Sequence, residues 1–167
     1  MPMPAPLSTF FAHDRGTAAA EMAISLPILF ALIFGSLELG NYFLSEHKVI
    51  KAVRDGARYA ARRPFTDYAG CAPSTTLVDD TRNVTRTGQV ASGGTPRVGS
   101  WTDPTSITVS ATCDNSGTYT GVYVSSIGTP VVTVAATVPY TSVLGQLGLA
   151  NVSLTLNATS KAAVTGI

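Results

Sequence analysis

The 167-residue sequence contains little charge: 13% of its residues are Asp, Glu, Lys or Arg, and the formal net charge is only +1. Nucleic-acid binding needs a strongly basic surface, so this balance argues against a nucleic-acid partner. Hydrophobic residues make up 45% of the chain, whereas disordered chains combine low hydrophobicity with high net charge. We therefore expect one modest domain with an appendage, and either folding or insertion into lipid.

Residues that carry catalysis or bind metals are also scarce. The chain has two histidines, His13 and His47, and His47 is distant in sequence from both cysteines. A Ser-His-Asp or Cys-His mechanism needs the histidine beside its nucleophile. The neighbouring acids Asp79 and Asp80 are too few for a zinc or calcium site. The sequence therefore predicts no enzyme, no cofactor and no metal site.

One long apolar run lies near the N-terminus. Residues Met22–Leu37 carry no charge, and Glu21 is the only ionisable residue between Thr17 and the end of the run. This length suffices for a helix that spans a bilayer. A buried core helix is the alternative, but a domain of about a hundred residues could hardly surround a helix that is apolar on every side. A cleaved secretory signal fits poorly, because Arg15 is the only firm cation before the run and no small-residue cleavage site follows it.

The helix is expected to continue beyond the apolar run, since no proline occurs between Pro27 and Pro64. It should end near Arg63, because proline disfavours helix in the preceding residue. Basic residues recur along it at helical spacing on one face: Lys48, Lys51, Arg54, Arg58 and Arg62. That face is either a site for acidic lipid headgroups or, as we favour, the solvated side of an amphipathic helix half covered by a domain.

Beyond Phe65 the pattern changes from helix to strand. Apolar and polar residues alternate at 107–112, 132–137 and 152–156, and a fourth, weaker run covers 119–124. Such alternation predicts a small antiparallel sheet covered on one face, with the amphipathic part of the long helix as its cover. A short helix between Pro73 and Gly88, capped by Ser74 or Thr75, completes an α+β fold.

The two cysteines, Cys71 and Cys113, both fall in this polar head. They are either free buried thiols or, if the head lies outside the cytoplasm, partners in a disulfide, which we favour. The positive-inside rule opposes export, since more basic residues follow the apolar run than precede it. We still favour export, because charges on a structured helix several turns from the membrane weigh less in that rule.

Two motifs resemble those of a known family. Gly16, with Glu21 at the start of the apolar run, is similar to a prepilin processing motif. A second motif resembles the helix-end signature of TadE-like minor pilins, or pseudopilins, of the tight adherence (Tad/Flp) pilus system. It consists of Asp55, Gly56, Ala57, Arg58 and Tyr59, with the two alanines that follow. Residues 65–105 match no pattern of that family.

The resemblance implies a pilin-like organisation: a prepilin leader at 1–16 cleaved before Thr17, a transmembrane helix at 17–40, its amphipathic continuation at 41–63 and a periplasmic α+β head at 64–167. It also implies a structural subunit of a Tad-type type IV pilus, anchored in the bacterial inner membrane. The implied partners are the prepilin peptidase, other pilin and minor pilin subunits, the inner-membrane assembly platform and the lipid bilayer. A second hypothesis remains open: a permanently anchored, exported module whose β-rich head binds a glycan or a surface protein.

Overall fold

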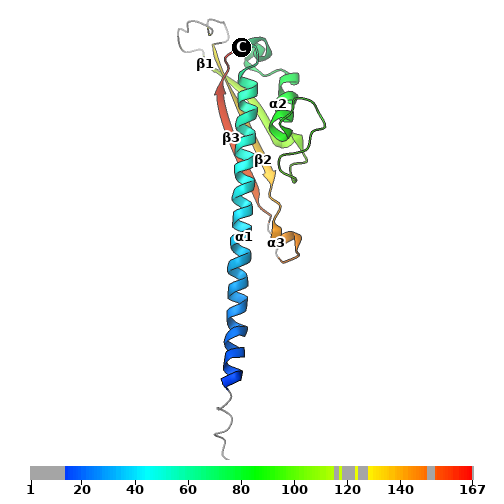
Figure 1. The fold of residues 1–167 in the computed structure, drawn as a ribbon. Helices are drawn as coiled ribbons and strands as arrows, with labels where there is room; N and C mark the ends of the chain where they lie inside the picture. The colour runs from blue at the N-terminus through cyan, green and yellow to red at the C-terminus, as the bar shows by residue number, and fades with distance from the viewer. Residues whose placement is uncertain (1–13, 115–116, 118–122, 124–127, 150–152, 167) are drawn as a thin grey trace, which may run out of the picture. The chain divides into compact units, whose positions relative to one another are not determined.

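A computed structural model describes residues 14–114, 117, 123, 128–149 and 153–166. The chain divides into two compact units, Met1–Gly40 and Asn41–Ile167. Helix α1 (Asp14–Ala61) contributes to both units. The second unit also contains α2 (Thr75–Thr87), α3 (Val143–Gln146) and a three-stranded sheet (Figure 1). The fold is therefore α+β, as the sequence predicts.

Helix α1 ends at Ala61, two residues earlier than the end expected at Arg63. The backbone N–H groups of Arg62 and Arg63 donate to carbonyls three residues back, which is the tighter spacing of a 3₁₀ turn. Pro64 disfavours helical backbone in the residue before it, so the regular helix gives way to this turn before the proline.

The sheet is antiparallel, with strand order β1 (Ile107–Asp114), β2 (Thr129–Pro139), β3 (Thr155–Ala163). Its inner face is apolar and carries the side chains of Ile107, Val132, Val134, Val138 and Leu156, all of them buried. On β1, the alternate residues Thr108, Ser110 and Thr112 are exposed. The strand period of two thus separates a buried face from a polar face, as the sequence pattern indicates.

The third strand lies further towards the C-terminus than the alternation at 152–156 indicates. β3 begins at Thr155 and continues to Ala163, and Leu154 before it is exposed. The inner side of its later part carries Ala158 and Ala162, which pack against the core, and such small side chains give a weak apolar signal. Of the fourth run, 119–124, only Tyr123 lies within the described residues.

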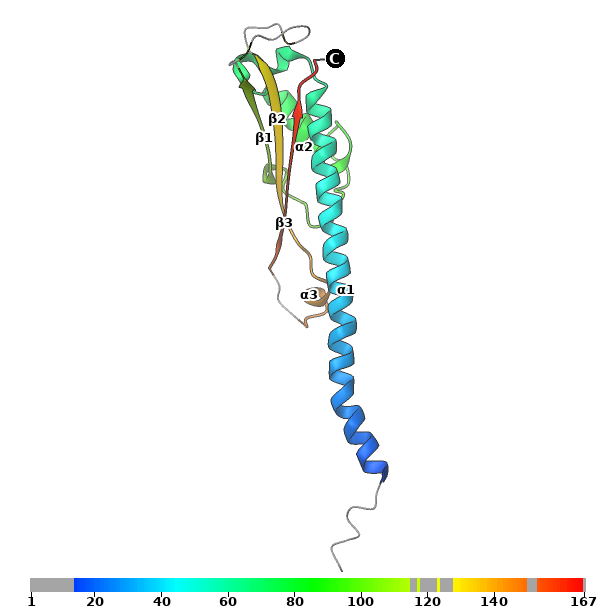
Figure 2. The ribbon, with the colours of Figure 1, turned by 90° about the vertical axis from the view of Figure 1, so that its left-hand side faces the viewer.

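Two helices cover the same face of the sheet (Figure 2). The second half of α1 buries Val49, Ala52, Val53, Ala57 and Ala60 in the core, and α2 adds Leu77. The ends of α2 follow from local sequence: the Ser74 hydroxyl accepts a hydrogen bond from the N–H of Leu77, and Gly88 closes the helix in left-handed backbone with φ of 82°. The predicted short helix is confirmed, and of the two possible caps, Ser74 and Thr75, Ser74 is the one that caps it.

Candidate functional site

The first unit exposes the apolar part of α1. Large side chains along it, including Met22, Ile24, Leu32 and Leu37, are exposed by 60% to 70%. Within the part of the chain that the structure describes, α1 is the one helix long and apolar enough to cross a membrane, with a mean hydropathy of 2.0 in its most apolar stretch. The helix is therefore compatible with a membrane anchor.

The residues expected to take part in processing lie at the start of this helix. Gly16, Thr17 and Glu21 belong to α1 and are exposed. Thr17 and Glu21 are four residues apart, so the helix brings them to the same face. Cleavage between Gly16 and Thr17 would therefore create an α-amine about one helical turn from the Glu21 carboxylate.

The motif Asp55–Ala61 lies at the opposite end of α1, where it contacts three other parts of the head. Gly56 is buried against α2. A Cβ atom added there would overlap the hydroxyl of Thr85 and would lie 3.6 Å from the backbone oxygen of Thr81. Ala57 and Ala60 are buried in the core cluster. Small residues in the motif thus allow α1 and α2 to approach closely.

Polar residues of the motif hold the neighbouring segments in place. Asp55 accepts a hydrogen bond of 2.6 Å from Arg97 Nη1, an ion pair that joins α1 to the loop after α2. Tyr59 donates its hydroxyl to Asp80 Oδ2 on α2 over 3.2 Å. Burial, followed by the negative charge of Asp80, raises the pKa of the Tyr59 phenol. The phenol therefore stays protonated and can donate at neutral pH.

The last carbonyl groups of α1 also find partners from distant parts of the chain. The hydroxyl of the buried Tyr68 donates to the backbone oxygen of Ala60 over 2.7 Å, and burial raises the pKa of that phenol. The backbone N–H of Thr165 donates to the oxygen of Ala61 over 2.8 Å. Helix ends leave carbonyls without intrahelical partners, and here the head supplies them.

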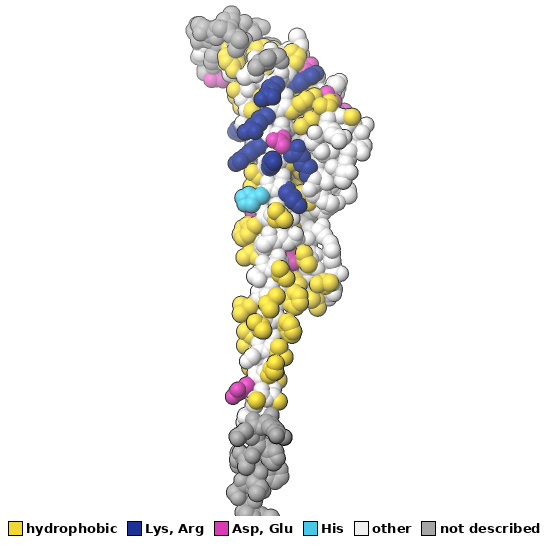
Figure 3. Space-filling model, in the orientation of Figure 1, with side chains coloured by type: hydrophobic (Ala, Val, Ile, Leu, Met, Phe, Trp, Pro, Cys, Tyr) yellow, Lys and Arg dark blue, Asp and Glu magenta, His cyan; other side chains and the backbone are white. Residues whose placement is uncertain are grey.

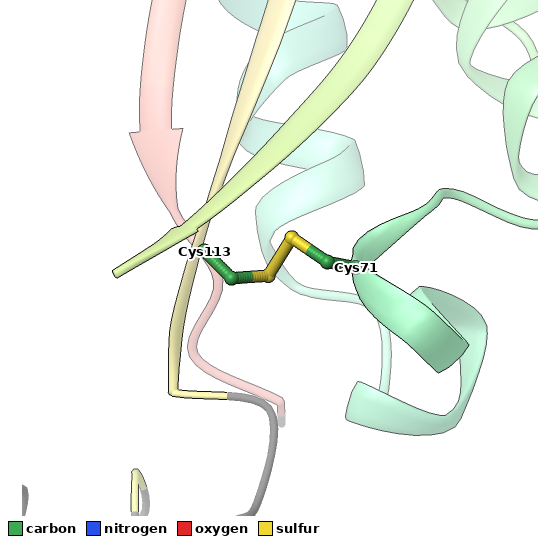
Figure 4. Close-up of a disulfide and its surroundings, with 2 residues drawn as sticks. All are labelled: Cys71 and Cys113. Atoms are coloured by element: carbon green, nitrogen blue, oxygen red, sulfur yellow. A yellow bond between two sulfur atoms is a disulfide. The ribbon is translucent and has the colours of Figure 1, made fainter. Parts of the chain in front are cut away.

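Cys71 and Cys113 form a disulfide (Figure 4). It connects the 3₁₀ segment Phe65–Cys71, which follows α1, to the end of β1. The two residues are 42 positions apart in sequence, so the bond closes a large loop that contains all of α2. The disulfide thereby ties the segment after α1 to the sheet.

A known family matches a segment that contains the first motif and the beginning of the second. Residues 16–58 match the TadE-like protein family. The long helix is TadE-like. This match confirms the resemblance seen in the sequence, over 43 of the 167 residues. No curated protein and no solved structure matches the chain.

The TadE-like segment lies entirely within α1, from Gly16 to Arg58. It therefore includes the exposed apolar part of the helix, and it includes Asp55 and Gly56, which contact the head. The sheet, α2 and the disulfide lie outside the matched residues. The family match therefore gives no role to the sheet, α2 or the disulfide.

A basic stripe runs along the second half of the TadE-like helix and into the turn after it. It is formed by Lys48, Lys51, Arg54, Arg58 and Arg62. All five side chains are exposed, and Figure 3 shows basic side chains gathered along this face. The ion pairs recorded among the described residues use other cations: Arg63 with Asp67, Arg82 with Asp79, and Arg97 with Asp55. The stripe therefore has the character of a solvated helix face.

The residues considered for catalysis or metal binding are dispersed. His13 lies outside the described residues, and His47 is exposed on α1. No group of three His, Cys, Asp or Glu side chains suited to a metal ion occurs within the ranges that the structure describes. Asp79 is exposed and pairs with Arg82, whereas Asp80 is half-buried and accepts the Tyr59 hydrogen bond. Asp80 thus contributes to helix docking, a role that its sequence position did not suggest.

Sequence reasoning missed the groups that join the motif to the rest of the head. Arg97 stands in a Gly-, Ser- and Pro-rich stretch that indicates only a loop, and its partner Asp55 is 42 residues away. Trp101 is fully buried and donates its indole N–H to Ser106 Oγ over 2.9 Å. A lone tryptophan in a loop was the one available signal, since a large aromatic ring is rarely left in water when a core is near.

Proposed function

We propose that the chain is a minor pilin, or pseudopilin, needed for assembly of a Tad-type type IV pilus. Helix α1 carries this proposal: its first part exposes apolar side chains on all sides, while its second part is built into a folded head. Lipid can cover the exposed part before assembly. The apolar helices of neighbouring subunits can cover it afterwards, through close helix packing.

The proposed organisation has a leader at 1–16, a transmembrane helix at 17–40, an amphipathic continuation at 41–63 and a periplasmic head at 64–167. The disulfide supports a periplasmic head, because disulfides persist in oxidising compartments. The subunit would sit in the bacterial inner membrane until it enters the pilus. Its partners would be the prepilin peptidase, the assembly platform and other pilin subunits.

In this mechanism the chain performs no chemistry of its own. A prepilin peptidase would cut between Gly16 and Thr17, and the new α-amine would lie on the same helix face as Glu21. Within one subunit the pair would help to neutralise the carboxylate; between subunits it would fix the axial register. The head would meanwhile remain attached through the Asp55–Ala61 motif.

The N-terminus of the mature protein tests the proposal. The protein is purified from membrane and pilus fractions of cells that contain the peptidase, and its first residue is determined by mass spectrometry. We expect a chain that begins at Thr17. Gly35→Ala serves as a matched control, since Gly35 lies on the same helix with open space around it, and this variant should be processed normally. An intact leader in the mature protein would contradict the proposal and favour the permanently anchored binding module.

A further inference from the structure

The connection between β2 and β3 exposes several large apolar side chains. Val143 is 40% exposed, Leu147 61%, Leu149 64% and Leu154 44%. Among the described residues of the second unit, the other large apolar side chains that are exposed are Phe43, Leu44 and Val90. Except for Val90, the exposed apolar groups thus come from this connection and from the part of α1 that opens the unit. We refer to residues 141–149 as the apolar loop.

Five consecutive backbone N–H groups of the apolar loop find acceptors within the loop. The hydroxyl of Ser142 accepts a hydrogen bond from the N–H of Gly145 over 2.9 Å. The next four N–H groups, from Gln146 to Leu149, donate to carbonyls within the loop over 2.9 to 3.2 Å. A peptide group without a partner is costly in lipid. Five consecutive donors satisfied within so short a segment make the loop suited to a water-poor environment.

Charge is absent from this region of the sequence. No Asp, Glu, Lys or Arg occurs between Asp114 and Lys161, so the loop and both strands beside it are uncharged over that range. A charged side chain would oppose entry into lipid. The loop itself therefore brings no charge into lipid; the nearby cations Lys48 and Arg97, which line a hollow with Thr141, Val143 and Gln146, belong to other segments.

Asn41, the first residue of the second unit, holds the apolar loop through two hydrogen bonds. Its side-chain amide donates to the Tyr140 hydroxyl over 2.9 Å and to the backbone oxygen of Thr141 over 3.4 Å. In sequence Asn41 directly follows Gly40, where the apolar run has ended. If residues 17–40 span the membrane, the loop begins where the chain leaves the hydrocarbon.

The surroundings of Asn41 have the composition of a membrane interface. The rings of Tyr42 and Tyr140 pack edge to face with centroids 5.2 Å apart, and tyrosine is enriched where a membrane meets water. Phe43 and Leu44 follow on α1 and are exposed. At about 100° per residue Phe43 lies on the side of the helix away from Asn41, whereas Leu44, three residues on, lies near the face of Asn41. Apolar groups therefore occur on more than one side of α1 at this level.

We propose that the apolar loop is a second membrane contact, whose Val143, Leu147 and Leu149 enter the boundary between lipid headgroups and acyl chains. The inference rests on the proposed function, because it requires residues 17–40 to anchor the chain. Shallow insertion of this kind reaches about 5–10 Å into the boundary. The contact would give the head an attachment to the bilayer of its own until the subunit is extracted.

The test uses the full-length chain, with its native disulfide, in vesicles of phosphatidylcholine and phosphatidylglycerol. Leu147→Cys is labelled with an environment-sensitive fluorophore, and quenching by spin-labelled phosphatidylcholine is measured. Ser110→Cys, exposed on the outer face of β1, is the matched control outside the loop. Leu32→Cys, within the apolar run, reports on the anchor itself. We expect blue-shifted, quenched emission for Leu147→Cys and Leu32→Cys, and neither effect for Ser110→Cys.

The outcomes separate this inference from the proposed function. Emission from Leu147→Cys that resembles Ser110→Cys, while Leu32→Cys is quenched, would overturn the loop contact and leave the anchor in place. Lack of quenching for Leu32→Cys would overturn the anchor and the loop contact together. A blue shift for Leu147→Cys that grows with the protein-to-lipid ratio but resists spin-labelled lipid would show that another subunit covers the loop, and would also overturn the inference.

Discussion

Gly56 on α1 lies directly against Thr85 on α2. A Cβ atom added to Gly56 would overlap the Thr85 hydroxyl and would lie 3.2 Å from its Cβ. Thr85 has no free space to move into, because it is fully buried and its hydroxyl donates to the backbone oxygen of Thr81 over 2.7 Å. Glycine is disfavoured inside a helix, and this contact explains its presence at this position.

Gly56→Ala should destabilise the head by about 1–3 kcal/mol through overpacking, although alanine is intrinsically the better helix former by about 1 kcal/mol. Gly56→Leu should disrupt the docking of α2 on α1 altogether. Denaturant unfolding followed by Trp101 fluorescence measures the first effect, and limited proteolysis measures the second.

Two controls accompany this prediction. Gly40→Ala lies on the same helix, where a Cβ meets nothing within 4 Å, so it should be neutral or slightly stabilising. Arg62→Ala removes an exposed side chain and should change little. Wild-type protease resistance in Gly56→Leu would show that the close contact is not required.

Loss of the Cys71–Cys113 bond should destabilise the head by about 4 kcal/mol, because the oxidised unfolded chain is constrained by a loop that spans 42 positions. Mass spectrometry of unreduced peptides establishes the bond, and urea unfolding of the wild type with and without reductant gives its contribution. The double variant Cys71→Ala/Cys113→Ala should be insensitive to reductant. Free thiols at both positions in protein isolated from the membrane fraction without reductant would refute the pairing and weaken the case for export.

The ion pair between Asp55 and Arg97 should contribute about 0.5–1 kcal/mol, because both side chains are partly exposed, at 31% and 28%. A double-mutant cycle with Asp55→Asn and Arg97→Gln should yield that coupling energy, and added salt should reduce it. Asp55→Asn combined with the exposed Lys161→Gln should instead be additive. A coupling energy of zero in the first cycle would mean that the interaction between Asp55 and Arg97 does not stabilise the head.

The head should lose stability as pH rises above about 10, the ordinary pKa of tyrosine. Burial raises the pKa of the Tyr68 phenol in the folded protein, so the unfolded chain loses its proton first. The contribution of Tyr68 is therefore complete below the unfolded pKa and falls as the solution becomes more alkaline. The free energy of unfolding is measured from neutral pH to about pH 11.

Tyr68→Phe is the variant that tests this assignment. It should lose about 1 kcal/mol at neutral pH with the hydrogen bond to Ala60, but it should show a smaller decline at alkaline pH. Part of the decline should remain, because the pKa of Tyr59 is raised in the same direction. A decline identical to that of the wild type would exclude Tyr68 as its source.

Glu21→Ala and Glu21→Gln should both insert into the membrane but fail in leader removal, in pilus incorporation, or in both. A carboxylate in a membrane helix usually has a partner, and cleavage before Thr17 would supply an α-amine with an ordinary pKa near 8. Immunoblots of membrane and sheared-pilus fractions report both steps. Normal incorporation of both variants would indicate that Glu21 only reaches to the lipid headgroups.

Local rules were sufficient where an element carries its own signals. Ser74 and Gly88 bracket α2, and Pro64 limits α1, so these boundaries could be predicted closely. The inner face of the sheet likewise follows from the alternation of Val and Thr in β2. The range predicted for β3 ended too early, because Ala158 and Ala162 do not stand out as apolar positions in the sequence.

Contacts between distant segments could not be predicted from the sequence. Asp55 and Arg97 meet only because α1 and α2 pack together first, and nothing near Arg97 indicates an acidic partner. The cysteines are the exception, because two thiols in one domain have only one possible pairing. The apolar loop was also missed, because its Leu residues suggest a core position until the fold leaves them exposed.

The hydrogen bond from Thr165 to Ala61 bears on the order in which the protein is made. A ribosome releases α1 long before residue 165, so the final carbonyl of the helix lacks this partner during nearly all of translation. Val164, which is fully buried, is likewise made more than 100 residues after the end of α1. The exposed apolar part of α1 is therefore available to the insertion machinery while the head is still open, and the head can close only once residue 165 has been made.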